Sequence, residues 1–323
     1  MKSRRQLLAL GCAMLALSLP PAHAQDNFPN RPVRLFVTFG PGSGPDTLAR
    51  TIAPRIAEHL GQNVVIENRP AAGGNVAAQQ LLQEKHDGYT LILATDSLFT
   101  MNPYLLPKSG FDVLNDFALV APVAEASVFL VAHPMLNVST AKELVALVKA
   151  NPGKYSYSAP TGTPHHLLGE RLTEMNGLNW VRVSYRDPQQ ALTEMLGGLV
   201  PIAFSSYAQV AGRVNAGKLK VLGVSTSSRL ESHAAVPALN ESFPGLEEAG
   251  WYALYAPAGT PRPVLERLAA AVAKARDSAD VRQRLDQLGM RALNVEGTSF
   301  SARVKADNQR RGELIRARGI SVD

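Results

Sequence analysis

Two loops rich in glycine and hydroxyl side chains are the segments of this sequence best suited to chemistry. They span residues 39–46 and 158–164, and each follows a predicted strand and precedes a predicted helix. Glycine lets backbone N–H groups approach a ligand closely, and a helix N-terminus adds free donors and about half a positive charge. Two such helix ends facing each other predict a site that holds a carboxylate without an arginine.

The two loops also have simpler or different interpretations. Each loop taken alone fits a plain tight turn, and the matched positions of the two favour the anion site. A dinucleotide site is the runner-up, because Gly42 and Gly44 follow a strand and Glu67 closes the next one. Against it, Thr47 occupies the third glycine position and Pro45 removes a donor from the helix start.

A hydrolase is a third possibility, with Ser43 as nucleophile and His165 or His166 as base. A nucleophile elbow needs glycine two residues before and after the serine, and here Pro41 and Pro45 stand there. Neighbouring histidines at a helix start diverge by about 100° and make a poor metal or catalytic pair. We therefore predict no catalytic residue, no metal and no cofactor, and a protein that is not an enzyme.

The elements that position these loops alternate between β and α patterns along the chain. Predicted strands cover 33–39, 64–67, 89–94, 117–123, 128–132, 155–158, 180–183, 202–204 and 219–224. Predicted helices cover 45–60, 75–85, 140–150, 164–175, a helix that opens at 187–188, and the tail from 263. Right-handed crossovers between such strands produce doubly wound sheets. The prediction is an α/β fold with two lobes, each a mainly parallel sheet flanked by helices.

The first twenty-four residues have the pattern of a cleavable signal peptide. A basic start, an apolar run at 7–19 and Ala22-His23-Ala24 predict cleavage before Gln25 and a periplasmic location. Arg4-Arg5 leaves the general secretory and twin-arginine routes open. The only cysteine, Cys12, lies in this leader, so the mature chain has no disulfide.

Length and charge set the domain organisation and exclude some partners. The leader holds three of the 33 basic residues, which leaves 30 against 27 acidic residues in the mature chain. This mild balance gives no reason to expect nucleic acid as a partner, and we expect a monomer. Chains of about 300 residues form two cores. We predict lobe one at 25–125 plus 246–323 and an inserted lobe two at 126–245.

Many short motifs, taken in order, resemble the Bug family, the periplasmic substrate-binding proteins of tripartite tricarboxylate transporters. The similarity runs from about Pro29 to the C-terminus. The motifs fall at 39–42, 46, 49–50, 61–62, 65–70, 72–75, 87–91, 102–103, 115–117, 162–163, 166–167, 169–170, 185, 191–192, 197–198, 251–252 and 256–261.

This resemblance implies a type II-like Venus flytrap that closes on a small organic carboxylate and presents it to the membrane subunits of a transporter. A sensor kinase is the alternative partner. Ser158 and Ser205 join the residues that the resemblance marks as ligand contacts, so the candidate set is Pro41, Gly42, Ser43, Asp46, Ser97, Ser158, Thr161, Gly162, Thr163, His166 and Ser205.

The sequence also departs from the family pattern near the predicted site. Ser43 and Pro160 replace glycines, and Phe204 is followed by Ser205 instead of the usual acidic residue. The anion site tolerates these changes, whereas contacts to the rest of the ligand need not be those of the family. The sequence therefore predicts a carboxylate ligand without naming it.

Overall fold

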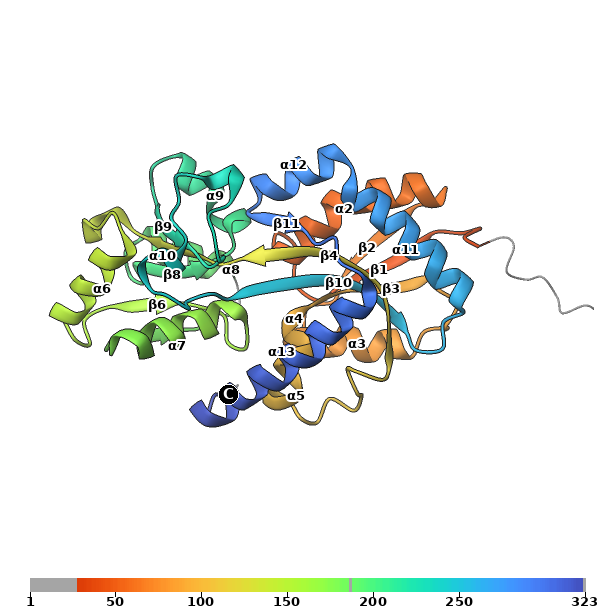
Figure 1. The fold of residues 1–323 in the computed structure, drawn as a ribbon, viewed down its shortest axis with the longest axis horizontal. Coiled ribbons are helices and arrows are strands. Elements are labelled where there is room, and N and C mark those ends of the chain that lie inside the picture. The colour runs from red at the N-terminus through yellow and green to blue at the C-terminus, as the bar shows by residue number, and fades with distance from the viewer. Residues whose placement is uncertain (1–27, 186–187, 322–323) are drawn as a thin grey trace, which may run out of the picture.

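The computed structural model describes residues 28–185 and 188–321 and shows two lobes placed end to end along the long axis (Figure 1). The predicted signal peptide, residues 1–24, lies outside the described residues. Each lobe has a central sheet with helices on both faces. The predicted two-lobed α/β fold is confirmed.

The first sheet has six strands in the order β11-β4-β10-β3-β1-β2. β1 pairs in parallel with both β2 and β3, whereas β10 runs antiparallel to β3 and β4, and β11 antiparallel to β4. The strands are β1 (Val33–Val37), β2 (Val64–Asn68), β3 (Thr90–Thr95), β4 (Phe117–Ser127), β10 (Ala249–Pro257) and β11 (Met290–Ala292).

Helices cover both faces of this sheet. One face packs against α2 (Gly44–Leu60), α11 (Arg262–Asp277) and α12 (Ala279–Gln287). The other face packs against α3 (Asn75–Leu82), α4 (Asp96–Thr100) and α13 (Gly297–Arg318). The short α5 (Asn102–Leu105) packs beside α13.

The second sheet has five strands in the order β7-β6-β8-β5-β9. β6 pairs in parallel with β7 and β8, and β5 pairs antiparallel with β8 and β9. The elements are β5 (Phe129–Ala132), β6 (Ser156–Ser158), β7 (Val181–Val183), β8 (Ile202–Ser205), β9 (Lys220–Val224), α6 (Ala141–Ala150), α7 (Pro164–Asn176), α8 (Pro188–Leu196), α9 (Tyr207–Asn215) and α10 (Leu239–Ser242).

Both sheets are mixed, so the expectation of mainly parallel sheets holds only for part of each. The antiparallel pairs arise where the chain passes between the lobes. β4 and β5 follow each other directly, one in each sheet, and β10 brings the chain back along β4. A strand that returns beside the strand that left must run in the opposite direction. β10 was also absent from the strands predicted from the sequence.

Helix α2, which begins at the first glycine-rich loop, shows how the local sequence fixes an element. Ser43 caps its N-terminus and Gly61 ends it in the left-handed conformation at φ 74°. Leu48, Ile52 and Ile56 recur at helical spacing and are buried against the sheet. Burial of each such side chain contributes roughly 1.5–3 kcal/mol, so packing holds the start of α2 in place.

The two chain crossings between the lobes are tied together by Ser225, which follows β9. Its hydroxyl accepts a hydrogen bond from the N–H of Val128 at 2.9 Å and donates one to the carbonyl of Glu248 at 2.6 Å. The outgoing and returning segments are thus joined at one point.

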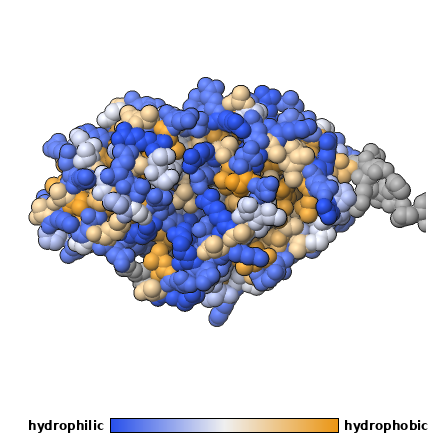
Figure 2. All heavy atoms as spheres, viewed as in Figure 1, coloured by the Kyte–Doolittle hydropathy of each residue, from blue (hydrophilic) through white to orange (hydrophobic). Residues whose placement is uncertain are grey.

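The visible surface of the protein is mostly polar. Figure 2 shows polar side chains over most of the face it presents, with apolar residues in small separate groups. In the ranges 28–185 and 188–321, no helix combines the length and apolar character needed to cross a bilayer.

Candidate functional site

A cavity of about 180 Å³ lies between the lobes and is lined by both. The N-terminal lobe contributes the first loop, the start of α4 and part of β10. The other lobe contributes the second loop and residues of α8, β8 and α9. The fold therefore brings the two glycine- and hydroxyl-rich loops to one cavity, although more than 100 residues separate them in the chain.

The first loop is braced by the buried carboxylate of Asp46. This carboxylate accepts hydrogen bonds from the N–H of Gly42 and the amide of Asn68, both at 2.9 Å, and from Arg50 at 3.0 Å. Burial alone would raise the pKa of Asp46, but the hydrogen bonds from Arg50, Gly42 and Asn68 outweigh it and lower the pKa. Asp46 stays ionised and holds the loop in shape.

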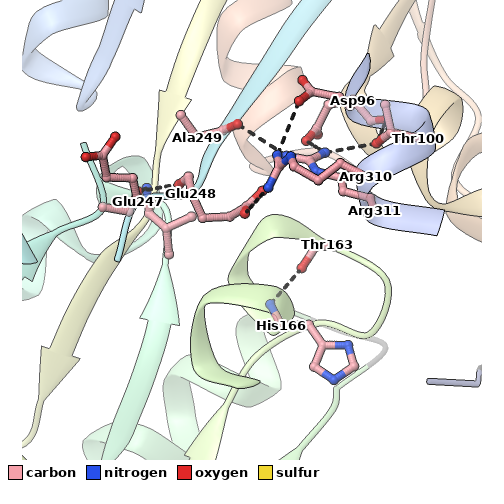
Figure 3. Close-up of polar contacts among 12 residues, drawn as sticks. Asp96, Thr100, Thr163, His166, Glu247, Glu248, Ala249, Arg310 and Arg311 are labelled. Carbon is pink, nitrogen blue, oxygen red and sulfur yellow. Dashed lines mark hydrogen bonds and ion pairs between the residues drawn. The ribbon is translucent and has the colours of Figure 1, made fainter. Parts of the chain in front are cut away.

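The second loop is capped by Thr163 and braced by His166 (Figure 3). The Thr163 hydroxyl accepts from the N–H of His166 at 3.4 Å and donates to the carbonyl of Pro160 at 2.7 Å. The His166 ring accepts from the N–H of Gly162 at 3.4 Å, and its other nitrogen lies 3.5 Å from the Glu170 carboxylate. The ring is thus engaged within its own lobe.

The backbone N–H groups at the starts of α2 and α7 are available in the cavity wall. The first N–H groups of a helix have no intrahelical acceptor, and here Pro45 and Pro164 carry no N–H at all. Within the described residues, no acceptor takes the N–H of Gly44 or of His165, and both residues line the cavity. Each helix start therefore offers one N–H to a ligand.

Two glycines allow the elements of the site to approach closely. A Cβ at Gly44 would lie 3.0 Å from the hydroxyl of Tyr252. A Cβ at Gly250 would lie 3.3 Å from the ring of Pro164 and 3.4 Å from the carboxylate of Asp96. Strand β10 thus contacts α2 at one glycine, and α4 and α7 at the other.

Five of the eleven predicted contact residues line this cavity, and six do not. The lining ones are Ser43, Ser97, Ser158, Thr163 and Ser205. The six that lie outside the wall are Pro41, Gly42, Asp46, Thr161, Gly162 and His166.

The residues outside the wall have other partners. Pro41 and Gly42 are exposed, and the Thr161 hydroxyl bonds to Ser184 and Arg182, each at 2.9 Å. Gly162 is buried at φ 67°, a left-handed backbone conformation that favours glycine, and a Cβ there would lie 2.7 Å from the end of the Leu105 side chain. The backbone of this loop therefore requires glycine.

Sequence reasoning left several polar residues of the wall out of the contact set, among them Asp96, Tyr252 and His165. Asp96 directly precedes the predicted Ser97, and Tyr252 lies in a family motif, so a signal for both was present. Burial, assisted by Asp96, raises the pKa of Tyr252, which keeps its hydroxyl as a donor. Burial lowers the pKa of His165 to about 4, so this imidazole is neutral at pH 7.

Behind the cavity wall, Arg311 of α13 bridges two buried carboxylates (Figure 3). Its guanidinium pairs with Asp96 and with Glu248 and donates to the Thr100 hydroxyl at 2.9 Å. Both acidic side chains and Arg311 are buried. One end of this network faces the cavity and the other lies at the returning chain crossing.

The geometry gives little support to the hydrolase and dinucleotide-binding interpretations of the two loops. Within the described residues no hydrogen bond joins Ser43 to a histidine; its hydroxyl caps α2. Hydrogen bonds from Arg34 and Arg69 hold Glu67 and lower its pKa to about 2, which is a structural role. Residues 28–185 and 188–321 hold no group of three or more His, Cys, Asp or Glu arranged for a metal ion.

Comparison with known proteins gives consistent results. A UPF0065 protein of Bordetella pertussis is 33% identical over 324 residues, covering 99% of each chain. The structure of R. palustris Rpa4515 with adipate superposes with a TM-score of 0.86 at 28% identity, over 91% of this chain and 100% of that one. The periplasmic binding protein BugD gives a TM-score of 0.83 at 28% identity, over 91% and 100%.

The family model for the tripartite tricarboxylate transporter family receptor, TctC, matches residues 48–320. This range contains the second lobe, most of the first lobe and most of the cavity wall. The sequence resemblance to the Bug proteins is confirmed by the same comparisons. The chain belongs to the tripartite tricarboxylate transporter receptor family.

Proposed function

We propose that this protein is an extracytoplasmic solute-binding protein that captures a small organic carboxylate between its lobes and presents it to a membrane transporter. The observation that carries the proposal is the pair of free N–H groups, at Gly44 and His165, on one cavity between two lobes. The leader at 1–24 would place the mature chain in the periplasm.

A carboxylate suits this arrangement electrostatically. Each free N–H lies in the first turn of a helix, where the backbone dipoles favour negative charge. Hydroxyl groups of Ser43, Ser158 and Tyr252 line the same cavity. Hydroxyls and N–H groups together satisfy the oxygens of one carboxylate.

The predicted contact residues then divide into two roles. Ser43, Ser97, Ser158, Thr163 and Ser205 line the cavity and are the proposed side-chain contacts. Pro41, Gly42, Asp46, Thr161, Gly162 and His166 shape the two loops and act through them.

Capture requires the lobes to move, and the chain crossings are the proposed hinge. Lobe one would comprise 25–125 plus 246–323, and lobe two 126–245. Ser225 joins both crossings through Val128 and Glu248. A ligand that contacts both lobes favours the closed form, and a membrane partner that prefers this form receives loaded protein.

A relative supports the ligand class. The R. palustris protein Rpa4515 was determined with adipate, a dicarboxylate. The two chains superpose over most of their length at 28% identity.

Thermal shift and calorimetry with a carboxylate panel test the proposal. Carboxylates should raise the melting temperature, since a ligand that binds only the folded state stabilises it. Sugars and amines should have no effect. Stabilisation by sugars or amines, with none by any carboxylate, would overturn the proposal.

A pair of capping variants separates binding from stability. Thr163→Val removes the hydroxyl that caps α7 in the cavity wall, and Thr140→Val removes the same kind of cap from α6, which does not line the cavity. Each loss of a cap should cost about 1 kcal/mol of stability. Only Thr163→Val should also weaken carboxylate binding, by about tenfold. Equal affinity of the two variants would remove Thr163 from the site.

A further inference from the structure

A third helix, α9, begins at the cavity in addition to α2 and α7. Ser206, the N-cap residue of α9, lines the cavity, and the helix is nine residues long. The first N–H groups of a helix have no intrahelical acceptor, and the backbone dipoles favour negative charge there. No side-chain hydrogen bond caps α9. An anion in the cavity can therefore take the place of the missing cap.

The hydroxyl of Ser206 is available to such an anion. Ser206 is only 9% exposed, and among the described residues its hydroxyl has no hydrogen-bond partner. The Ser43 hydroxyl, by contrast, accepts from its own helix α2, and the Ser205 hydroxyl donates to the Gln209 side chain at 3.0 Å. A buried hydroxyl without a partner is unfavourable unless the cavity supplies one. Ser206 is thus left for a group that the cavity holds.

Ser206 lies beside the start of α2. The Cβ position at Gly44 is 3.9 Å from the Ser206 hydroxyl oxygen and 3.0 Å from that of Tyr252. Burial raises the pKa of Tyr252, so its hydroxyl keeps the proton and remains a donor. The N–H of Gly44 and the two hydroxyls therefore meet at one place in the cavity wall.

These three donors come from different lobes. Gly44 begins α2 and Tyr252 lies in β10, which belong to the lobe of the first sheet, whereas Ser206 begins α9 in the lobe of the second sheet. A carboxylate held at Gly44 gains the Ser206 hydroxyl only while the lobes are together. A ligand shifts an equilibrium between two forms by the difference in its affinity for them. A donor that the second lobe adds increases this difference.

We propose that Ser206 is a ligand contact through which the second lobe closes on the bound carboxylate. The inference rests on the proposed function and adds a residue to the contacts predicted from the sequence, which include Ser205 and not Ser206. The Ser206 hydroxyl donates to the carboxylate held by the N–H of Gly44, and this carboxylate caps α9. Binding and closure then depend on each other.

Calorimetry with adipate, benzoate and acetate tests the contact, because these probes share a carboxylate and differ elsewhere. Ser206→Ala should weaken the binding of each by about tenfold. The melting temperature of the ligand-free protein should change little, since no hydrogen bond of the hydroxyl is lost. Unchanged affinities would overturn this inference and leave the proposed function standing. Failure of the unaltered chain to bind any of the three probes would overturn the carboxylate site itself.

Ser278→Ala is the matched control for that variant. Ser278 is the N-cap residue of α12, which also has nine residues and no side-chain cap, and it does not line the cavity. This variant should bind the three probes as the unaltered chain does. A loss of affinity equal to that of Ser206→Ala would overturn the assignment of a direct contact.

A negative charge at Ser206 separates contact with the carboxylate from capping of α9. Asp and Asn are both good N-cap residues and nearly equal in size, so Ser206→Asp and Ser206→Asn should both remain folded, as circular dichroism would establish. Ser206→Asp places a like charge beside the ligand and should weaken each probe at least about tenfold more than Ser206→Asn does. Equal affinities of the two variants would overturn the contact.

The distance between the lobes tests the coupling to closure. The mature chain has no cysteine, so Leu199→Cys and Arg262→Cys introduce two unique sites for spin labels. These positions are 72% and 89% exposed and lie in different lobes. Saturating benzoate should change the distance between the labels, and Ser206→Ala should leave a larger fraction in the ligand-free distance. Equal closed fractions at saturation would overturn the coupling.

Discussion

Arg311 and Asp96 form a buried ion pair between residues 215 positions apart in the chain. Asp96 begins α4 in the cavity wall, whereas Arg311 lies in the last helix, and the same guanidinium reaches Glu248 at the chain crossing. The C-terminal helix thus fixes a residue of the ligand cavity.

Loss of Arg311 should destabilise the protein strongly. Arg311→Met leaves the buried carboxylate of Asp96 without a cation and that of Glu248 with only Arg310 at 3.6 Å and Arg171 at 3.8 Å. Removing one partner of a buried pair costs about 3–5 kcal/mol. Urea unfolding measures this loss. Arg262→Ala is the control, because Arg262 is 89% exposed and its surface pair with Glu266 contributes at most about 1 kcal/mol. Similar losses for the two variants would contradict the role of the buried network.

The close approach of Gly44 to Tyr252 predicts a pair of coupled substitutions. In Gly44→Ala the new methyl group would lie 3.0 Å from the Tyr252 hydroxyl, and overpacking of this kind costs about 1–3 kcal/mol. Tyr252→Phe removes the hydroxyl and should restore most of the stability in the double variant. A double-mutant cycle by thermal unfolding measures the coupling. Additive effects would show that Gly44 is not constrained by Tyr252.

The acceptor role of Asp46 predicts a loss of stability that depends on pH. Asp46→Asn weakens the hydrogen bonds from Gly42, Asn68 and Arg50, at a cost of about 1–3 kcal/mol. The pKa of Asp46 is lowered in the folded protein, so its contribution is complete above the ordinary value of 3.8 and is lost as the pH falls through the lowered value.

Urea unfolding of both proteins from pH 7 to pH 2 measures that difference. The gap between native and Asp46→Asn protein should be constant down to about pH 4 and shrink below it. Arg50→Ala should cost less than Asp46→Asn, because Arg50 is 55% exposed. A stability difference that grows as the pH falls would contradict the role of the ionised Asp46 carboxylate in holding the loop.

The neutral ring of His165 predicts carboxylate binding that does not change with pH near neutrality. Burial lowers the pKa of this imidazole to about 4, so no proton is taken up between pH 5.5 and 8. The backbone N–H of His165, not its ring, is the proposed donor. Calorimetry over this pH range checks the point. Tighter binding on acidification that disappears in His165→Asn would show that the imidazolium participates.

The lowered pKa of His165 also makes the stability of the folded protein depend on pH. The unfolded chain protonates this histidine near its ordinary value of 6.5, whereas the folded chain does so only near 4. The native state should therefore lose stability as the pH falls from about 6.5 to 4. His165→Asn should lack this part of the acid dependence.

Several features of this protein follow from the sequence by itself, because they depend on neighbours in the chain. Ser43 and Thr163 cap helices by accepting hydrogen bonds from N–H groups three positions later in the chain. Gly61 ends α2 because it adopts a left-handed backbone conformation. Alternating strand and helix patterns gave the α/β fold. The same local patterns identified both loops that meet at the cavity.

Other features depend on residues that only the folded chain brings together. Asp46 and His166 were predicted to contact the ligand, yet their side chains form hydrogen bonds with the loops and do not line the cavity. The direction in which a side chain points is set by packing, which a motif does not contain. The contacts that Gly250 and Tyr252 of β10 make with α2, α4 and α7 depend on the folded chain in the same way.

The two ends of the cavity illustrate the same distinction. The proposed anion site was predictable, since a helix N-terminus and its loop are adjacent in sequence. The end formed by the second lobe combines Leu192, Phe204 and Val210 from three elements, and the sequence shows them only as ordinary core residues. Tertiary structure decided this part because a binding surface is made by side chains that are distant in the chain and close in space.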